Sequence, residues 1–241
     1  MSIPALLEIA VTSPEGAATA VAAGADRLEV CEALEIGGIT SNPETVAAVL
    51  QAAGNIGVHA LIRPRGGNFV YSEAETDLML AQARRTAAAG VAGLVIGALN
   101  ADGQVEADSM ETLISQARAI NPEIELTFHR AIDAAVDPVT AIGVLIDLGF
   151  TRVLSSGGAP AAPDGVPTLR AMAAAAGGRL QVMAGGGMRP ETIATVLEAG
   201  VDAVHFSAKS DSADGSHWVT DQVTVKTLRS TVDACNQMNH G

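Results

Sequence analysis

The sequence predicts a single (β/α)8 barrel of the TIM type, and three observations support that prediction. Short apolar runs alternate with helical stretches along the chain, which is typical of parallel α/β folds. The length of 241 residues lies near the usual length of one such barrel. No composition change or long linker divides the chain, so we treat residues 1–241 as one domain.

A repeated junction marks four of the eight expected strands. At each junction a helix ends, a glycine follows in the position of a left-handed C-cap, and a buried strand begins shortly afterwards. The junctions begin at Ala23, Ala89, Leu148 and Ala199. Four more strand-like runs lie between them, at residues 6–11, 58–62, 125–128 and 180–184.

Capping residues mark where several helices begin. Ser13, Asn42 and Asp137 each precede a proline, which is favoured at the first position of a helix. Ser72 and Glu75 form a capping-box pattern. We expect a last helix over residues 220–237, and loose segments at 159–165 and 209–216.

Composition limits the classes of function. A net charge of -13 argues against a nucleic-acid partner or an anionic membrane, because both are bound through clustered Lys and Arg. The chain has no apolar run long enough for a membrane span and no basic leader, so we expect a cytoplasmic protein. Its two cysteines lie far apart, which favours reduced thiols.

Two carboxylates interrupt apolar strands. Glu8 stands between Leu7 and Ile9, and Glu29 stands between Leu28 and Val30. Since such strands are buried on both faces, we expect both side chains to point into the barrel. They are either proton carriers or members of a structural ion pair with an arginine.

Arg63 and Arg65 follow the third strand at alternate positions, directly before Gly66 and Gly67. Guanidinium groups bind carboxylates and phosphates well, so both arginines are candidates for holding an anionic ligand. Neutralisation of the two buried glutamates is the alternative. The sequence does not decide between these interpretations.

The stretch after the fifth strand contains His129, Arg130 and Asp133 within five residues. Barrel enzymes keep their catalytic groups at the carboxyl ends of strands. Histidine titrates near neutral pH, so His129 is a candidate general acid or base. We expect Asp133 to orient His129 and Arg130 to hold an anion.

Glycines and small polar residues end the last three strands. Three successive glycines after the seventh strand can present backbone N–H groups to an anion, which barrels often bind near strands seven and eight. The sequence therefore predicts a bound anion at this rim. The candidate contacts are Ser156, Gly157, Gly185, Gly186, Gly187, His205 and Ser207.

Several motifs together resemble the CutC family, which is named for copper homeostasis. They include Leu-Glu-Ile at 7–9, Arg-Leu-Glu-Val-Cys at 27–31, Ile-Arg-Pro-Arg-Gly-Gly at 62–67, Thr-Phe-His-Arg-Ala-Ile-Asp at 127–133 and His-Phe-Ser-Ala at 205–208. The resemblance covers nearly the whole chain. It implies a cytoplasmic (β/α)8 barrel, often an oligomer, with a role in copper tolerance or trafficking and no established reaction.

Copper itself is the ligand that the family name implies, and Cys31 is the candidate metal ligand. Some family members carry paired cysteines in the first strand, where this chain has Ala10 and Val11. The histidines and cysteines show no close metal-ligand spacing, and no motif indicates another cofactor.

Three functions therefore remain open. The first is an acid–base isomerase or lyase acting on a small anionic, possibly phosphorylated, metabolite. The second is a copper(I)-binding or trafficking protein that uses Cys31 without catalysis. The third is a catalytically inactive barrel that serves as an interaction scaffold.

Overall fold

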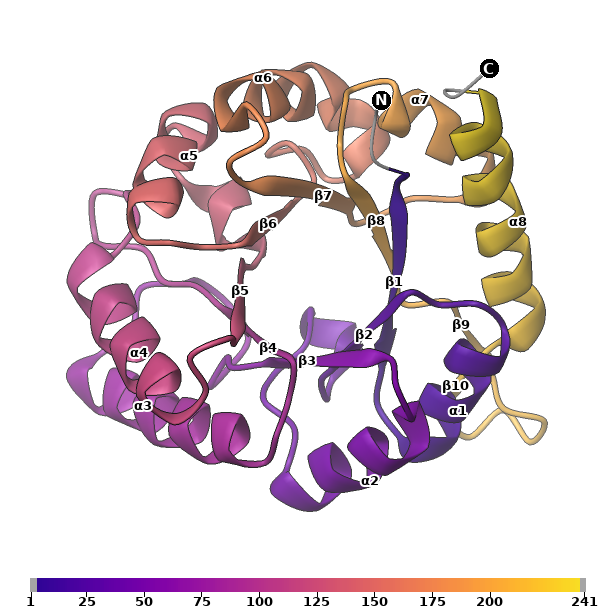
Figure 1. The fold of residues 1–241 in the computed structure, drawn as a ribbon, viewed down its shortest axis with the longest axis horizontal. Coiled ribbons are helices and arrows are strands. Elements are labelled where there is room, and N and C mark those ends of the chain that lie inside the picture. The colour runs from indigo at the N-terminus through magenta and orange to yellow at the C-terminus, as the bar shows by residue number, and fades with distance from the viewer. Residues whose placement is uncertain (1–3, 239–241) are drawn as a thin grey trace.

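The computed structural model describes residues 4–238 and confirms the predicted barrel (Figure 1). Eight parallel strands pair in sequence order, and β8 pairs with β1 to close the ring. The other six residues of the predicted 1–241 domain lie outside the described range. The strands are β1 Leu6–Val11, β2 Arg27–Val30, β3 Gly57–Leu61, β4 Gly93–Ile96, β5 Glu125–Phe128, β6 Arg152–Ser155, β7 Gln181–Gly185 and β8 Ala203–Phe206.

The helices form an outer ring around the strands, as Figure 1 shows. The four predicted junction glycines all adopt positive φ, between 79° at Gly149 and 98° at Gly24. This left-handed conformation ends a helix and lets the chain turn back toward the barrel. The helices are α1 Pro14–Ala22, α2 Pro43–Ala53, α3 Glu73–Ala88, α4 Ala107–Ile120, α5 Pro138–Asp147, α6 Val166–Ala176, α7 Ile193–Leu197 and α8 Gln222–Met238.

The expected helix caps are present. The side chains of Ser13, Asn42 and Asp137 each accept a hydrogen bond from a backbone N–H in the first turn of α1, α2 and α5. Ser72 and Glu75 form the reciprocal capping box of α3. These bonds satisfy N–H groups that have no partner within the helix, so they determine where each helix begins.

Side chains alternate along each strand between two environments. In β1, Leu7, Ile9 and Val11 belong to the main apolar core, which packs the strands against the helices. Glu8 and Ala10 point the other way, into the lumen, because successive side chains of a strand face opposite sides. The lumen contains two small, separate apolar clusters and a set of charged side chains.

One segment differs from the prediction. Residues 209–216 were expected to be loose, but β9 Lys209–Asp211 pairs antiparallel with β10 Trp218–Thr220. The Lys209 ammonium lies 3.0 Å from the centre of the Trp218 ring, an arrangement that favours a cation–π interaction. Strands of three residues are too short to show a periodic pattern, so the sequence did not reveal this hairpin. In the other expected loose segment, residues Ala162–Gly165 form a 3-10 turn.

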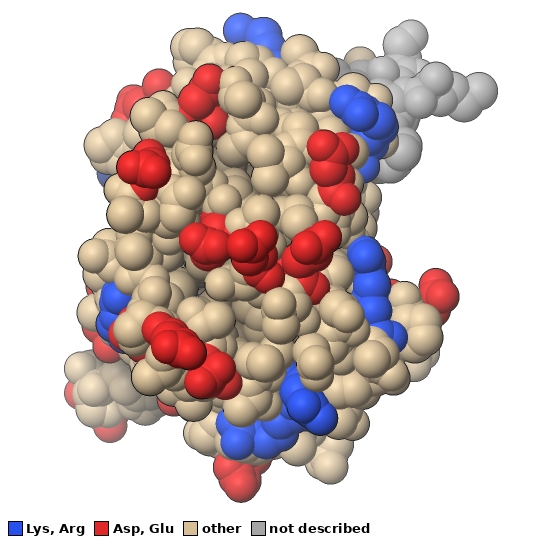
Figure 2. Space-filling model, turned by 90° about the vertical axis from the view of Figure 1, so that its left-hand side faces the viewer, with Lys and Arg blue, Asp and Glu red and all other residues tan. Residues whose placement is uncertain are grey.

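Acidic side chains gather on one side of the outer surface. Figure 2 shows a band of Asp and Glu side chains across the side of the ring where α3, α4 and α5 lie in Figure 1. Within residues 4–238, no helix has the length and apolar character needed to cross a membrane.

Candidate functional site

A cavity of about 410 Å³ opens at the carboxyl ends of the strands. The ends of β2, β3, β5, β6 and β8 and the loop after β7 form its wall, and Thr224 and Leu228 of α8 contribute as well. This is the end of a (β/α)8 barrel where catalytic residues are found. The cavity brings together several predicted residues: Glu29, Cys31, Arg63, His129, Arg130, Gly186, Gly187, His205 and Ser207.

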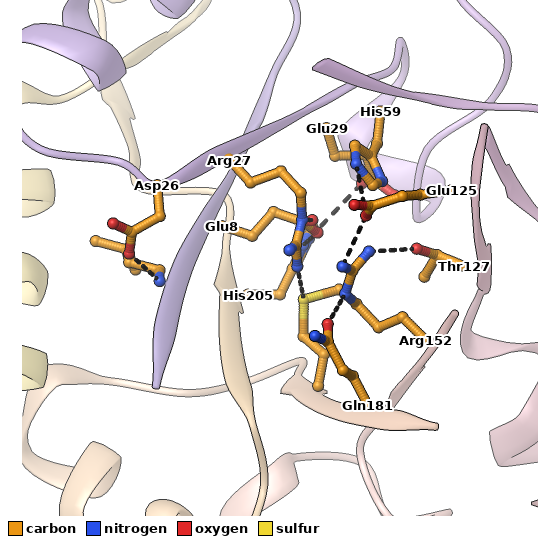
Figure 3. A network of polar contacts seen from close by, with 12 residues as sticks. Glu8, Asp26, Arg27, Glu29, His59, Glu125, Thr127, Arg152, Gln181 and His205 are labelled. Atoms are coloured by element: carbon orange, nitrogen blue, oxygen red, sulfur yellow. Dashed lines mark hydrogen bonds and ion pairs between the residues drawn. The ribbon is translucent and has the colours of Figure 1, made fainter. Parts of the chain in front are cut away.

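The floor of the cavity is connected to a buried ion pair. Below the cavity, Glu8 pairs with the Arg27 guanidinium, which also donates to the Met183 sulfur at 3.3 Å (Figure 3). The other carboxylate oxygen of Glu8 lies 2.7 Å from His205 Nδ1. On its opposite side, His205 Nε2 lies 3.7 Å from a Glu29 oxygen. The imidazole ring of His205 therefore lies between two carboxyl groups.

This arrangement shifts the pKa values of Glu8, His205 and Glu29 in different ways. Burial by itself would raise the pKa of Glu8, but the charges of Arg27 and His205 hold that pKa well below its usual value. Burial lowers the pKa of His205, whereas Glu29 and Glu8 raise it, and the net pKa is raised. Burial raises the pKa of Glu29 to about 7, against the opposing effect of His205. Glu29 is thus the carboxyl group that can change protonation state at neutral pH.

The Glu29 carboxyl group is accessible from the cavity. Glu29 is 6% exposed and lines the cavity. Within residues 4–238 its carboxyl group makes no hydrogen bond, and its ion-pair contact is with His205 Nε2 at 3.7 Å. A ligand in the cavity can supply the missing partner.

A second group of charged side chains lies in the lumen beside the Glu8–Arg27 pair (Figure 3). Arg152 donates to Glu125 at 2.9 Å, to Gln181 at 2.9 Å and to Thr127 at 3.1 Å. His59 Nε2 lies 3.4 Å from Glu125, and burial lowers the pKa of His59 to about 4. None of these residues lines the cavity, so we assign them a structural role.

His129 occupies the predicted place on the cavity wall, but its environment does not fit the predicted acid–base role. Burial, with the nearby charge of Arg63, lowers the pKa of His129 to about 3. Its Nδ1 accepts a hydrogen bond from the Ala131 backbone N–H at 3.1 Å. The ring packs beside Phe69, with 5.1 Å between ring centres. His129 therefore stays neutral at physiological pH and does not exchange a proton readily.

The predicted pairing of Asp133 with His129 is wrong. Asp133 accepts hydrogen bonds from Arg130 at 2.8 Å, from the Ser155 hydroxyl at 2.6 Å and from the Ser156 backbone N–H at 3.0 Å. It also accepts one from the Gly158 N–H at 3.1 Å. Asp133 thus orders the loop after β6 and positions Arg130, so its role is structural.

The prediction for Arg65 is corrected as well. Arg65 pairs with Glu75 at 2.6 Å and donates to carbonyls of its own loop, and it does not line the cavity. Arg63 lines the cavity but donates to the carbonyls of Ile36, Gly38 and Gly67. Neither arginine neutralises Glu8 or Glu29, because Arg27 pairs with Glu8 and neither forms an ion pair with Glu29 within residues 4–238.

Three predicted ligand contacts lie behind the cavity wall. The Ser156 backbone N–H donates to Asp133, its hydroxyl donates to the Ala159 carbonyl, and the Gly157 N–H donates to the Ser155 hydroxyl. Gly185 packs against Leu154 and His205. None of the three lines the cavity, so their predicted contact with a ligand is not supported.

The loop after β7 and Arg130 form one side of the cavity. Gly186 and Gly187 have φ values of 98° and 63°, and a Cβ on Gly186 would lie 2.9 Å from Arg130 Nη1. Arg130 uses Nε for Asp133 and Nη2 for Ser156, and Nη1 makes no hydrogen bond within residues 4–238. After the glycines, Pro190–Thr192 form a 3-10 turn that leads into the five-residue α7. The glycine loop and Arg130 are therefore the groups that can bind an anion here.

The charge of the cavity wall is opposite to that of the whole chain. Four Lys or Arg side chains line the cavity, whereas Glu29 is the only carboxyl group on it within the described residues, and the net charge of the chain is -13. A concave site lined by one sign of charge concentrates ligands of the other sign. The cationic residues are Arg63, Arg130, Arg189 and Lys209.

Cys31 lies on the cavity wall among Ala10, Leu61 and Val95. Burial, together with Glu29 and Glu32, raises the pKa of its thiol well above the usual value. Thiolate, not thiol, is the form that binds metals tightly. Among residues 4–238, no group of three or more His, Cys, Asp or Glu side chains is placed to hold a metal ion. The surroundings of Cys31 therefore do not favour the predicted copper(I) site.

Comparison with known proteins identifies the family. The CutC family model matches residues 5–210. The chain belongs to the CutC family. A CutC-family protein of Sinorhizobium medicae is 38% identical over 244 residues, covering 95% of this chain and 96% of the relative. The human copper homeostasis protein cutC homolog is 39% identical over 211 residues, covering 87% of this chain and 76% of the relative.

A solved CutC structure agrees with the barrel. The crystal structure of CutC from Streptococcus agalactiae has a TM-score of 0.76 and 28% sequence identity. The match covers 84% of this chain and 98% of the Streptococcus agalactiae chain. The resemblance noted in the sequence motifs is thereby confirmed.

We expect the Glu8–Arg27 pair to be essential for stability. Arg27→Met should lower the free energy of unfolding by about 3–5 kcal/mol, because it leaves the buried Glu8 carboxylate with only His205 as its cationic partner. Adding Glu8→Gln to Arg27→Met should recover more than half of that loss. Urea denaturation of both variants measures the effect. A loss below about 1 kcal/mol for Arg27→Met would contradict this account.

Stability should also fall in acid because of His129. Its pKa is about 3 in the folded protein and near 6.5 when unfolded, so the unfolded state binds more protons between these values. Neutral His129 therefore contributes fully to the free energy of unfolding above pH 6.5. This contribution decreases as the pH falls toward 3, by at most about 1.4 kcal/mol per pH unit. His129→Gln should make stability less dependent on pH between about 4.5 and 6.5. Urea titrations of wild type and variant test this, and equal slopes would show that His129 titrates normally.

Proposed function

We propose that the chain is an enzyme that binds a small anionic molecule in the rim cavity and transfers a proton to or from it. The observation that supports this function best is Glu29, a buried carboxyl group on the cavity wall that makes no hydrogen bond within the described residues. A carboxyl group with a pKa of about 7 is present in both protonation states at neutral pH. It can therefore act as general base in one step and as general acid in the next.

The other groups around Glu29 have supporting roles in this proposal. His205, charged and held by Glu8, stabilises the carboxylate form of Glu29 after it has given up its proton. Arg130 Nη1 and the N–H groups of Gly186 and Gly187 bind the anionic group of the ligand. Ser207 offers a further hydroxyl group on the same wall. Proton transfer beside a bound anion suits an isomerase or a carbon–carbon lyase.

Direct copper(I) binding at Cys31 is the alternative function that the family name brings forward. It receives less support, because the thiol is buried among apolar side chains and its pKa is raised. Copper(I) titration of wild type and Cys31→Ser separates the two functions. A large loss of affinity in the variant would favour the copper-binding function.

Glu29→Gln should abolish proton transfer while the protein remains folded, because glutamine has the same shape and cannot titrate. The measurement is deuterium incorporation, followed by mass spectrometry, into a small-metabolite extract incubated with the protein in D2O. We expect wild type to label at least one anionic metabolite and the variant to label it at least about 100-fold more slowly. Arg84→Gln, on the exposed outer surface of α3, is the control for loss of a charged residue. Equal labelling by Glu29→Gln and wild type would exclude Glu29 as the proton carrier.

A further inference from the structure

The two sides of the cavity differ in chemistry. Arg130, Gly186 and Gly187 lie on the side formed by the loop after β7. The ends of β2 and β3 form another side, and β3 lies four strands from β7 in the closed ring of eight, so the two sides face each other across the mouth. Glu29 of β2 and His205 of β8 lie on the floor between them.

The side at β2 and β3 is largely apolar apart from Glu29 and Arg63. Leu61 and Cys31 belong to a small lumen cluster against which the half-buried Leu34 packs. Phe69 completes this wall and lies against the His129 ring. The nearby Arg63 directs its Nη atoms to backbone carbonyls and is also stacked on Phe69, with 5.0 Å from its guanidinium carbon to the ring centre.

Few groups on the wall can replace water around a polyhydroxylated ligand. Within the described residues, no Asp, Asn, Gln, Tyr or Trp side chain lines the cavity, and apart from Lys and Arg the groups that can bond hydroxyls are Glu29, His129, His205, Ser207 and Thr224. Hydroxyl groups placed against Leu34, Leu61 and Phe69 would lose their hydrogen bonds to water without replacement, which is unfavourable. Apolar atoms in the same place gain affinity by leaving water.

We propose that the ligand is an anion with an apolar, ring-sized body and few hydroxyl groups. Its anionic group lies at Arg130 and the glycine loop, and its apolar body lies against Leu34, Leu61 and Phe69. Its reacting atom then lies over Glu29. This inference rests on the proposed anion-binding function and adds the class of ligand to it.

Isothermal titration calorimetry of the full chain with three probes tests the proposal. The probes are inorganic phosphate, benzylphosphonate and ribose 5-phosphate, which share an anionic group and differ in the body attached to it. Burying about 100 Å² of a ring should tighten binding about 10- to 100-fold over inorganic phosphate. Ribose 5-phosphate should bind no more than about threefold tighter than inorganic phosphate, because its hydroxyls lose water on the apolar wall.

A variant locates the binding of the ring. Leu34→Ser should weaken benzylphosphonate about fivefold or more and leave inorganic phosphate unchanged, since it removes apolar contact only. Leu78→Ser is the matched control, because Leu78 is 47% exposed on α3 and does not line the cavity. It should change neither affinity.

The outcomes separate this inference from the proposed function. If inorganic phosphate binds and benzylphosphonate binds no tighter, or if ribose 5-phosphate binds tightest, the apolar body is excluded while the anion site remains. If none of the three probes binds, both the anion site and the ligand class are contradicted. The wild-type ranking gives this result even where a variant fails to fold.

Discussion

The buried ion pair between Glu8 and Arg27 is the interaction on which the site depends. Most barrels fill the lumen with branched apolar side chains, but here the ring encloses full charges, and an unpaired one would be strongly unfavourable. Arg27 keeps Glu8 ionised, and ionised Glu8 in turn favours the charged form of His205. Glu29 then lies beside a cation yet retains a pKa of about 7, because burial opposes its ionisation.

Burial acts in opposite directions on the two candidate proton carriers of this cavity. Loss of water disfavours the charged form of each group, so it lowers the pKa of His129 and raises that of Glu29. Among the residues that the structure describes, His129 has no carboxylate partner and lies near Arg63, whereas His205 lies between two carboxyl groups. The carboxyl group, not the histidine after β5, is consequently the group that titrates near neutrality.

Much of the fold follows from local patterns in the sequence. Glycines at helix ends, capping residues before prolines and alternating apolar runs locate the strands and helices, because each reflects a short-range conformational requirement. Glu8 and Glu29 were predicted to face the lumen because carboxylates are unusual in buried strands. The same reasoning applied to Arg27, His59 and Arg152 would have revealed the rest of the lumen network.

Other features of the site depend on contacts that no local pattern encodes. Asp133 was paired with His129 because the two are close in sequence, but the 3-10 turn over Arg130–Ala134 directs Asp133 toward the loop after β6. Two glycines in and after β4 indicate where the buried histidine rings lie. A Cβ at Gly93 would lie 2.6 Å from the His59 ring, and a Cβ at Gly97 would lie 2.6 Å from the His129 ring. Glycine within a strand often marks such a close approach.

The protonation of Glu29 is the most direct test of this account. Carbon-13 NMR of protein labelled at glutamate carboxyl groups, with the resonance assigned by Glu29→Gln, would follow its titration between pH 4 and 9. We predict a midpoint near 7, well above the ordinary glutamate value of 4.5. A midpoint at the ordinary value would show that Glu29 is a permanently ionised structural group, and the proposed chemistry would not hold.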